Sequence, residues 1–259
     1  MAEEKRQFPP EMVNLPSKGV LYPKESSISK GEIEVKYMTA KEEDILTSQN
    51  LIRKGIVIDK LLESLVVDES INLDDILIGD KNALMVASRV LGYGKDYQFE
   101  LNCPACGERN TDNVDLTKLG EKSIDHSHLK GGKNEFDFEL PTSKRKITYK
   151  LLTQSDEREI DAELKALKKI SGGSNVDPEI TTRLKRAIVS VDGKSDTAYV
   201  NSFVDNEFLS RDSLAFRNHL LEIPPDVDMN YLFSCELCDF DQGVTVPMTV
   251  QFFWPSAKR

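Results

Sequence analysis

The sequence predicts an α+β fold, in which an antiparallel sheet with zinc-ribbon-like four-cysteine knuckles combines with helical layers and an extended N-terminal arm. Short stretches alternate apolar and polar residues, and two of them run directly into a Cys-x-x-Cys sequence. Longer stretches repeat apolar residues at helical spacing. We expect one composite globular body with five consecutive segments: an arm (1–36), a helical segment (37–96), a first knuckle with antiparallel strands (97–152), a second helical segment (153–228) and a second knuckle with C-terminal strands (229–259).

The N-terminal arm is expected to be extended because its prolines and glycines prevent a long helix: Pro9, Pro10, Pro16, Pro23, Gly19 and Gly31. It also carries apolar side chains, among them Leu15, Leu21 and Tyr22, which are costly to leave in water. We therefore expect the arm to lie on another surface. An alternating stretch at 33–37 predicts a strand where the arm ends.

Helices are predicted from capping residues and from apolar spacing. A capping box at 39–42 predicts a helix over about 40–48, and a second helix follows Gly55. Asp80 is placed to cap a third helix that continues to about residue 91. Further helices are expected at 160–170 after a box-like 153–156, from 178 toward 191, and at 212–221.

Strands are predicted where apolar residues alternate. The stretches at 97–101, 136–140 and 147–151 show this pattern, and a plausible hairpin connection at 142–145 joins the last two. The middle of the chain is therefore expected to form an antiparallel sheet. Terminal strands are expected at 231–233, 244–246 and 250–254.

All four cysteines lie in two identical spacings, formed by Cys103 with Cys106 and by Cys235 with Cys238. Two such turns complete a tetrahedral four-sulfur site, and four thiolates leave no open position, so we predict one structural zinc ion per chain. The 128 residues between the pairs exceed the usual ribbon spacing. Two reduced thiol pairs without metal, or a redox-active dithiol, therefore stay open as alternatives.

Charge and motif content argue against most enzymatic and nucleic-acid functions. The chain has 34 Lys and Arg against 44 Asp and Glu, a net charge of −10, which disfavours binding to phosphate backbones. No apolar run has the length of a membrane span, and no phosphate-binding loop or nucleophile elbow occurs. We expect no catalysis, no small-molecule substrate, and no nucleic-acid or membrane partner.

Several short motifs, in their order and spacing, resemble the T4-type bacteriophage baseplate protein family: 15–19 (Leu-Pro-Ser-Lys-Gly) with Tyr22-Pro23, 38–46, 77–82, and Cys103-Pro104-x-Cys106-Gly107. The resemblance implies a non-enzymatic component of a contractile-tail baseplate, at or near its hub, or a factor that assembles the hub and is absent from the mature virion. It implies that the partners are other baseplate or hub proteins and that the chain is assembled in the host cytoplasm. Association between copies of the chain stays open.

A proline-interrupted apolar arm is suited to lying along a neighbouring subunit, because its limited freedom lowers the ordering cost of binding. We therefore expect Leu15, Pro16, Leu21 and Tyr22 to make intersubunit contacts, and a chain without residues 1–30 to remain folded. From other classes of function, a zinc-ribbon nucleic-acid adaptor and a dithiol oxidoreductase remain alternatives.

Overall fold

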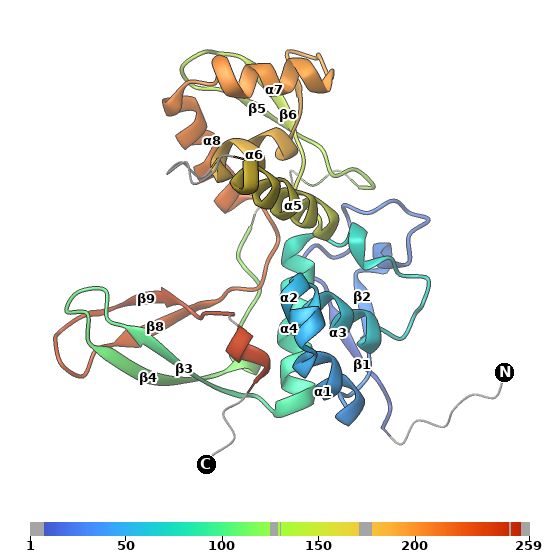
Figure 1. Cartoon of the computed structure of the whole chain (residues 1–259), viewed down its shortest axis with the longest axis vertical. Coiled ribbons are helices and arrows are strands. Elements are labelled where there is room, and N and C mark those ends of the chain that lie inside the picture. The colour runs from blue at the N-terminus through green and yellow to red at the C-terminus, as the bar shows by residue number, and fades with distance from the viewer. Residues whose placement is uncertain (1–7, 125–128, 130, 171–177, 249, 255–259) are drawn as a thin grey trace.

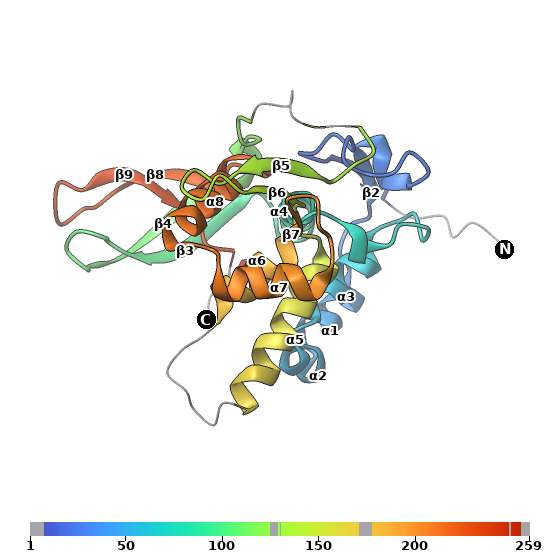
Figure 2. The same cartoon turned by 90° about the horizontal axis from the view of Figure 1, so that it is seen from above.

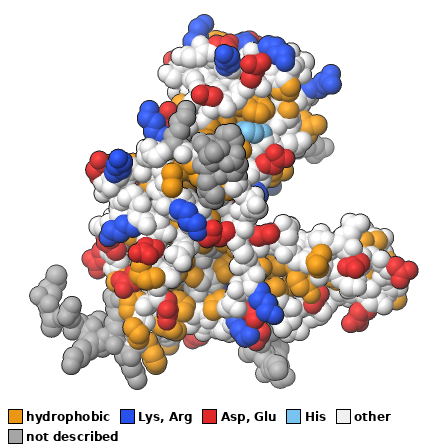
Figure 3. All heavy atoms as spheres, turned by 180° about the vertical axis from the view of Figure 1, so that it is seen from behind, with side chains coloured by type: hydrophobic (Ala, Val, Ile, Leu, Met, Phe, Trp, Pro, Cys, Tyr) orange, Lys and Arg blue, Asp and Glu red, His pale blue; other side chains and the backbone are white. Residues whose placement is uncertain are grey.

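The computed structural model describes residues 8–124, 129, 131–170, 178–248 and 250–254. Figure 1 shows three parts. They are an N-terminal lobe (residues 8–95), a helix–sheet lobe (residues 131–170 and 178–225), and a double hairpin formed by β3 (Asp96–Asn102), β4 (Arg109–Asp115), β8 (Asn230–Ser234) and β9 (Asp241–Thr245). The view in Figure 2 shows α5 (Gln154–Ile170) reaching from the helix–sheet lobe toward the helices of the N-terminal lobe. From behind, the double hairpin projects from the body and leaves a hollow beneath the helix–sheet lobe (Figure 3).

The described elements mix helices with small antiparallel sheets, as the sequence predicts. The helices are α1 (Ala40–Thr47), α2 (Gln49–Lys54), α3 (Val57–Leu65), α4 (Ile78–Tyr93), α5 (Gln154–Ile170), α6 (Glu179–Ala187), α7 (Thr197–Asn206) and α8 (Ser210–Glu222). The strands are β1 (Glu11–Asn14), β2 (Glu32–Val35), β3 (Asp96–Asn102), β4 (Arg109–Asp115), β5 (Phe136–Glu139), β6 (Lys146–Tyr149), β7 (Ile188–Val191), β8 (Asn230–Ser234) and β9 (Asp241–Thr245). Within the described ranges, no helix has the length and apolar character needed to cross a membrane.

Among the described residues, the strands pair antiparallel in four small sheets: β1 with β2, β3 with β4, β5 with β6 and β7, and β8 with β9. The two hairpins that carry the cysteines are the β3–β4 and β8–β9 pairs. In the three-stranded sheet, Phe136 lies opposite Tyr149, and Ile147 lies opposite Val191. These four side chains are buried, so the alternation in the sequence reports the covered face of this sheet.

Some predicted elements are wrong. The helix α4 begins at Ile78 after Leu77, so Asp80 lies inside the helix and does not cap it. The expected strand at 250–254 is a 3₁₀ helix over Val250–Phe253, with the side chains of Phe252 and Phe253 buried. The helix expected to run toward residue 191 ends at Ala187, and β7 begins at the next residue, Ile188. The sequence patterns also give no prediction for α2, β4 or α7.

The predicted capping box of α1 is confirmed, and its Glu42 is fully buried. The Glu42 carboxylate accepts hydrogen bonds from the Thr39 N–H (2.9 Å), the Thr39 hydroxyl (2.6 Å) and the Ser64 hydroxyl (2.7 Å). The Lys36 ammonium lies 3.1 Å away. Burial by itself would raise the pKa of Glu42, but these hydrogen bonds hold it at about 2, below its usual value of 4.5.

The depressed pKa of Glu42 predicts acid sensitivity. Because the folded pKa lies below the unfolded one, the carboxylate stabilises the fold above about pH 4.5 and loses that contribution as the pH falls toward 2. Urea unfolding of the wild type and of Glu42→Gln should differ by up to about 3 kcal/mol at pH 7, and the difference should shrink below pH 4.5. A difference that stays constant across this range would contradict the assignment.

Candidate metal centre and the buried motif junction

The two Cys-x-x-Cys sequences occupy the turns of the two hairpins. Cys103 directly follows β3 and Cys235 directly follows β8. Backbone hydrogen bonds close each turn, from the Cys103 N–H to the Glu108 carbonyl (2.7 Å) and from the Cys235 N–H to the Phe240 carbonyl (2.9 Å). Gly107 has a φ of 77°, in the left-handed region that favours glycine. Each hairpin therefore presents two sulfurs to the same side of a tight turn.

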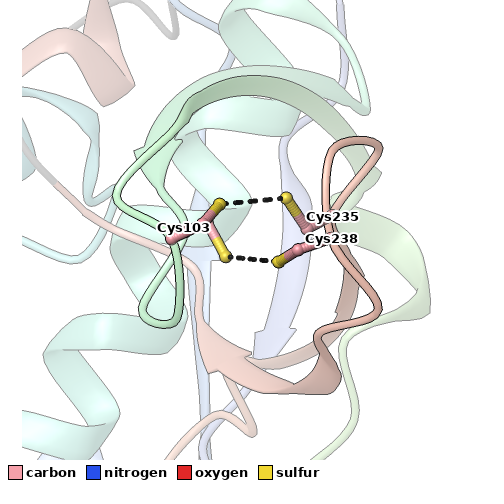
Figure 4. Close-up of side chains that lie close together, drawn as sticks. Cys103, Cys235 and Cys238 are labelled. Atoms are coloured by element: carbon pink, nitrogen blue, oxygen red, sulfur yellow. Dashed lines mark hydrogen bonds between the residues drawn. The ribbon is translucent and has the colours of Figure 1, made fainter.

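The four sulfurs lie in one cluster, although the pairs are far apart in the sequence. Figure 4 shows the two turns facing each other. Cys103 Sγ lies 3.7 Å from Cys238 Sγ, and Cys106 Sγ lies 3.8 Å from Cys235 Sγ. All four ligand atoms lie within 4.8 Å of one another. A tetrahedron with zinc–sulfur bonds of about 2.3 Å has sulfur–sulfur edges of about 3.8 Å, whereas a disulfide would require about 2.05 Å. The geometry fits a tetrahedral four-sulfur metal site.

The electrostatics of the cluster favour a bound cation. The backbone N–H groups of Leu237 and Cys238 lower the pKa of the Cys235 thiol to about 6. At Cys238 the Phe240 N–H also favours the thiolate, yet burial and the neighbouring sulfurs raise the pKa to about 12. Thiolates this close repel one another, so all four ionise together only when a cation supplies the opposite charge.

A small apolar cluster supports the sulfurs. Cys103 and Cys235 are buried with Phe233, and side chains that include Tyr231 and Phe240 pack around them. The Asn110 side-chain N–H donates to Cys235 Sγ over 3.8 Å. Four cysteines fill a tetrahedral coordination sphere, so the arrangement suits a structural ion that holds the two hairpins together and leaves no position for water or substrate.

The structure contradicts the predicted intersubunit role of Leu15, Pro16, Leu21 and Tyr22. All four side chains are buried, with Leu15 at 0% exposure, and they lie in the chain's own core. Residues 11–14 pair with β2, so the arm folds back on the N-terminal lobe. The apolar residues are shielded from water by their own chain, and the reason to expect a partner over them is removed.

Two of the sequence motifs meet at a buried carboxylate that sequence reasoning missed as a site. Asp80 is fully buried, and it accepts hydrogen bonds from the Ser17 N–H (2.9 Å), the Ser17 hydroxyl (2.6 Å) and the Tyr22 hydroxyl (2.6 Å). Tyr22 accepts in turn from the Leu77 N–H (2.9 Å). Burial raises the pKa of Asp80 against the effect of these hydrogen bonds. The available signal was a single carboxylate inside an otherwise largely apolar helix.

The rest of the 77–82 motif joins the N-terminal lobe to later segments. A Cβ added at Gly79 would lie 1.8 Å from the Pro225 carbonyl oxygen, so only glycine allows this approach of the two backbones. Lys81 contacts Asp59 (2.8 Å) in α3, and Asn82 donates to Asp226 (3.0 Å). The motif residues that carry the resemblance therefore hold the chain's own parts together.

A family model described as T4 bacteriophage base plate protein matches residues 20–254, nearly the whole chain. The chain belongs to this family. The match includes Asp80 and all four cysteines. Searches of curated proteins and of solved structures returned no match. Membership in this baseplate family indicates a structural component of a phage tail baseplate that associates with other baseplate proteins, in a kind of family that is usually non-enzymatic.

Proposed function

We propose that this baseplate-family protein is a non-enzymatic structural subunit at or near the hub of a contractile tail baseplate. The single observation that carries the proposal is the family match over residues 20–254. The three-part body supports it, because several connected surfaces project in different directions, as a subunit with several neighbours requires (Figure 1). The chain would be assembled into the tail in the host cytoplasm.

We further propose that one zinc ion per chain is bound by Cys103, Cys106, Cys235 and Cys238 as a structural ion. The sulfur–sulfur separations of 3.7 and 3.8 Å support this ligand set. The ion would fix two hairpins that join segments more than 100 residues apart without a disulfide, which a reducing cytoplasm disfavours. The double hairpin would then stay rigid while the tail assembles.

Quantitative mass spectrometry of purified baseplates and of mature virions tests the structural role. We expect the chain in both, at a fixed whole-number ratio to the other baseplate proteins. Presence in baseplate intermediates and absence from mature virions would instead indicate an assembly factor. Absence from both would refute the proposal.

A further inference from the structure

A groove lies where the helix–sheet lobe meets the start of α4. It has a volume of about 660 Å³ and apolar walls that include Leu77, Ile180, Leu184, Leu220, Leu221 and Pro224. Two of these side chains are unusually open for their type, with Ile180 48% and Leu221 71% exposed. Apolar side chains also reach the surface of the helix–sheet lobe in Figure 3. Open apolar surface around a concavity of this size is typical of a binding site.

The charged groups of the groove are paired, with one exception. Lys150 lies 2.8 Å from Asp156, and Arg183 contacts both Glu157 (2.7 Å) and Glu179 (3.1 Å). Asp226 accepts a hydrogen bond from the Asn82 side chain (3.0 Å). The remaining charged group, Arg217 of α8, has no ion pair with any residue that the structure describes, and its buried Nε has no hydrogen-bond partner there. An unsatisfied buried donor is costly, and a ligand carboxylate beside this guanidinium would lower that cost.

We propose that this groove binds a segment of another baseplate protein in which a carboxylate stands beside bulky apolar side chains. The carboxylate accepts hydrogen bonds from Arg217, and the apolar side chains fill the space between Ile180 and Leu221. This inference rests on the proposed baseplate role, which supplies a protein as the partner.

Charge complementarity favours a segment with a carboxylate as the ligand of this groove. An arginine binds a carboxylate through two parallel N–H donors, and a guanidinium at the edge of an apolar groove is a frequent centre of binding energy. A second copy of this chain is disfavoured, because two bodies with a net charge of −10 repel each other as they approach. The carboxylates of the groove already interact with other partners, as Asp226 does with Asn82 (3.0 Å). They therefore do not pair with Arg217.

Photocrosslinking in the assembled baseplate tests the proposal. The full chain, with p-benzoylphenylalanine at position 221, complements a phage that lacks it, and purified baseplates are irradiated. We expect a crosslink to another baseplate protein, mapped to a segment that holds an Asp, a Glu or a C-terminal carboxylate next to large apolar residues. Arg217→Gln should lower the crosslink yield at least tenfold. Arg211→Gln, an exposed arginine of the same helix outside the groove, should leave the yield unchanged.

A second variant serves as a control for misfolding of Arg217→Gln. Ile180 also lines the groove and is half-exposed, so Ile180→Asp should fold, and its added negative charge should also reduce the crosslink. Equal yields from the wild type and both variants, a crosslink only to a second copy, or no crosslink in baseplates that contain the chain would overturn the proposal. A loss with Ile180→Asp alone would overturn the role of Arg217. The amount of the chain in each baseplate, measured before irradiation, separates these results from failure of the baseplate role itself.

Discussion

A chain that lacks residues 1–30 is expected to be unfolded, because this segment supplies part of the core. It contains Leu15, Leu21, Tyr22 and Ile28, each at most 5% exposed. Burial of one such side chain contributes roughly 1.5–3 kcal/mol, so losing four costs about as much as the roughly 5–15 kcal/mol by which a domain is stable. Removal of β1 also leaves β2 without its partner. Circular dichroism with thermal unfolding should show no cooperative transition for the N-terminal lobe.

Point variants in the same segment give a matched control. Leu15→Ala should lower the free energy of unfolding by about 3 kcal/mol, because it leaves a cavity in the core. Met12 of β1 is 51% exposed, and Met12→Ala should change the free energy of unfolding by less than about 0.5 kcal/mol. A truncated chain that unfolds cooperatively at the wild-type temperature would restore the view of a detachable arm.

Asp80→Ala is expected to be the most damaging single substitution considered. It removes the acceptor of three hydrogen bonds and leaves the Ser17 N–H, the Ser17 hydroxyl and the Tyr22 hydroxyl without this partner in the core. Each buried donor left without an acceptor costs about 1–3 kcal/mol, so we expect a total loss of about 3–5 kcal/mol. Chemical denaturation measures the loss.

Two comparisons make the Asp80 prediction specific. Asp44 is exposed on α1, and Asp44→Ala should change the free energy of unfolding by only a few tenths of a kcal/mol. Tyr22→Phe removes one of the three donors and also the acceptor of the Leu77 N–H, and should cost about 1–3 kcal/mol. An Asp80→Ala variant as stable as Asp44→Ala would show that the buried junction contributes nothing to stability.

Local patterns predicted the elements that follow local rules. The Thr39 and Glu42 spacing identified the start of α1, because a capping box is satisfied within one turn. Alternation identified the strands at 136–139 and 146–149, which have one buried face. The strand predicted at 250–254 was wrong, because a short buried apolar run is compatible with either a strand or a helical turn.

Long-range choices could not be predicted in the same way. The apolar residues of the arm can be buried by their own chain or by a neighbour, and the sequence does not distinguish the two surfaces. An aspartate near the start of a helix can be either a helix cap or a buried hydrogen-bond acceptor. For Asp80, only the positions of Ser17 and Tyr22 in the folded chain distinguish the two roles. The meeting of the cysteine pairs was predicted from coordination chemistry, which demands four ligands, rather than from spacing.

Metal content per chain tests the central claim most directly. The protein is purified without chelator, and elemental analysis is made of the wild type and of the Cys235→Ser/Cys238→Ser variant. One zinc per wild-type chain, lost in the variant, is the predicted result, because the two hairpins complete one site with sulfur separations of 3.7 and 3.8 Å. Folded wild-type protein without zinc, or a variant that retains a full zinc equivalent, would contradict a shared structural centre.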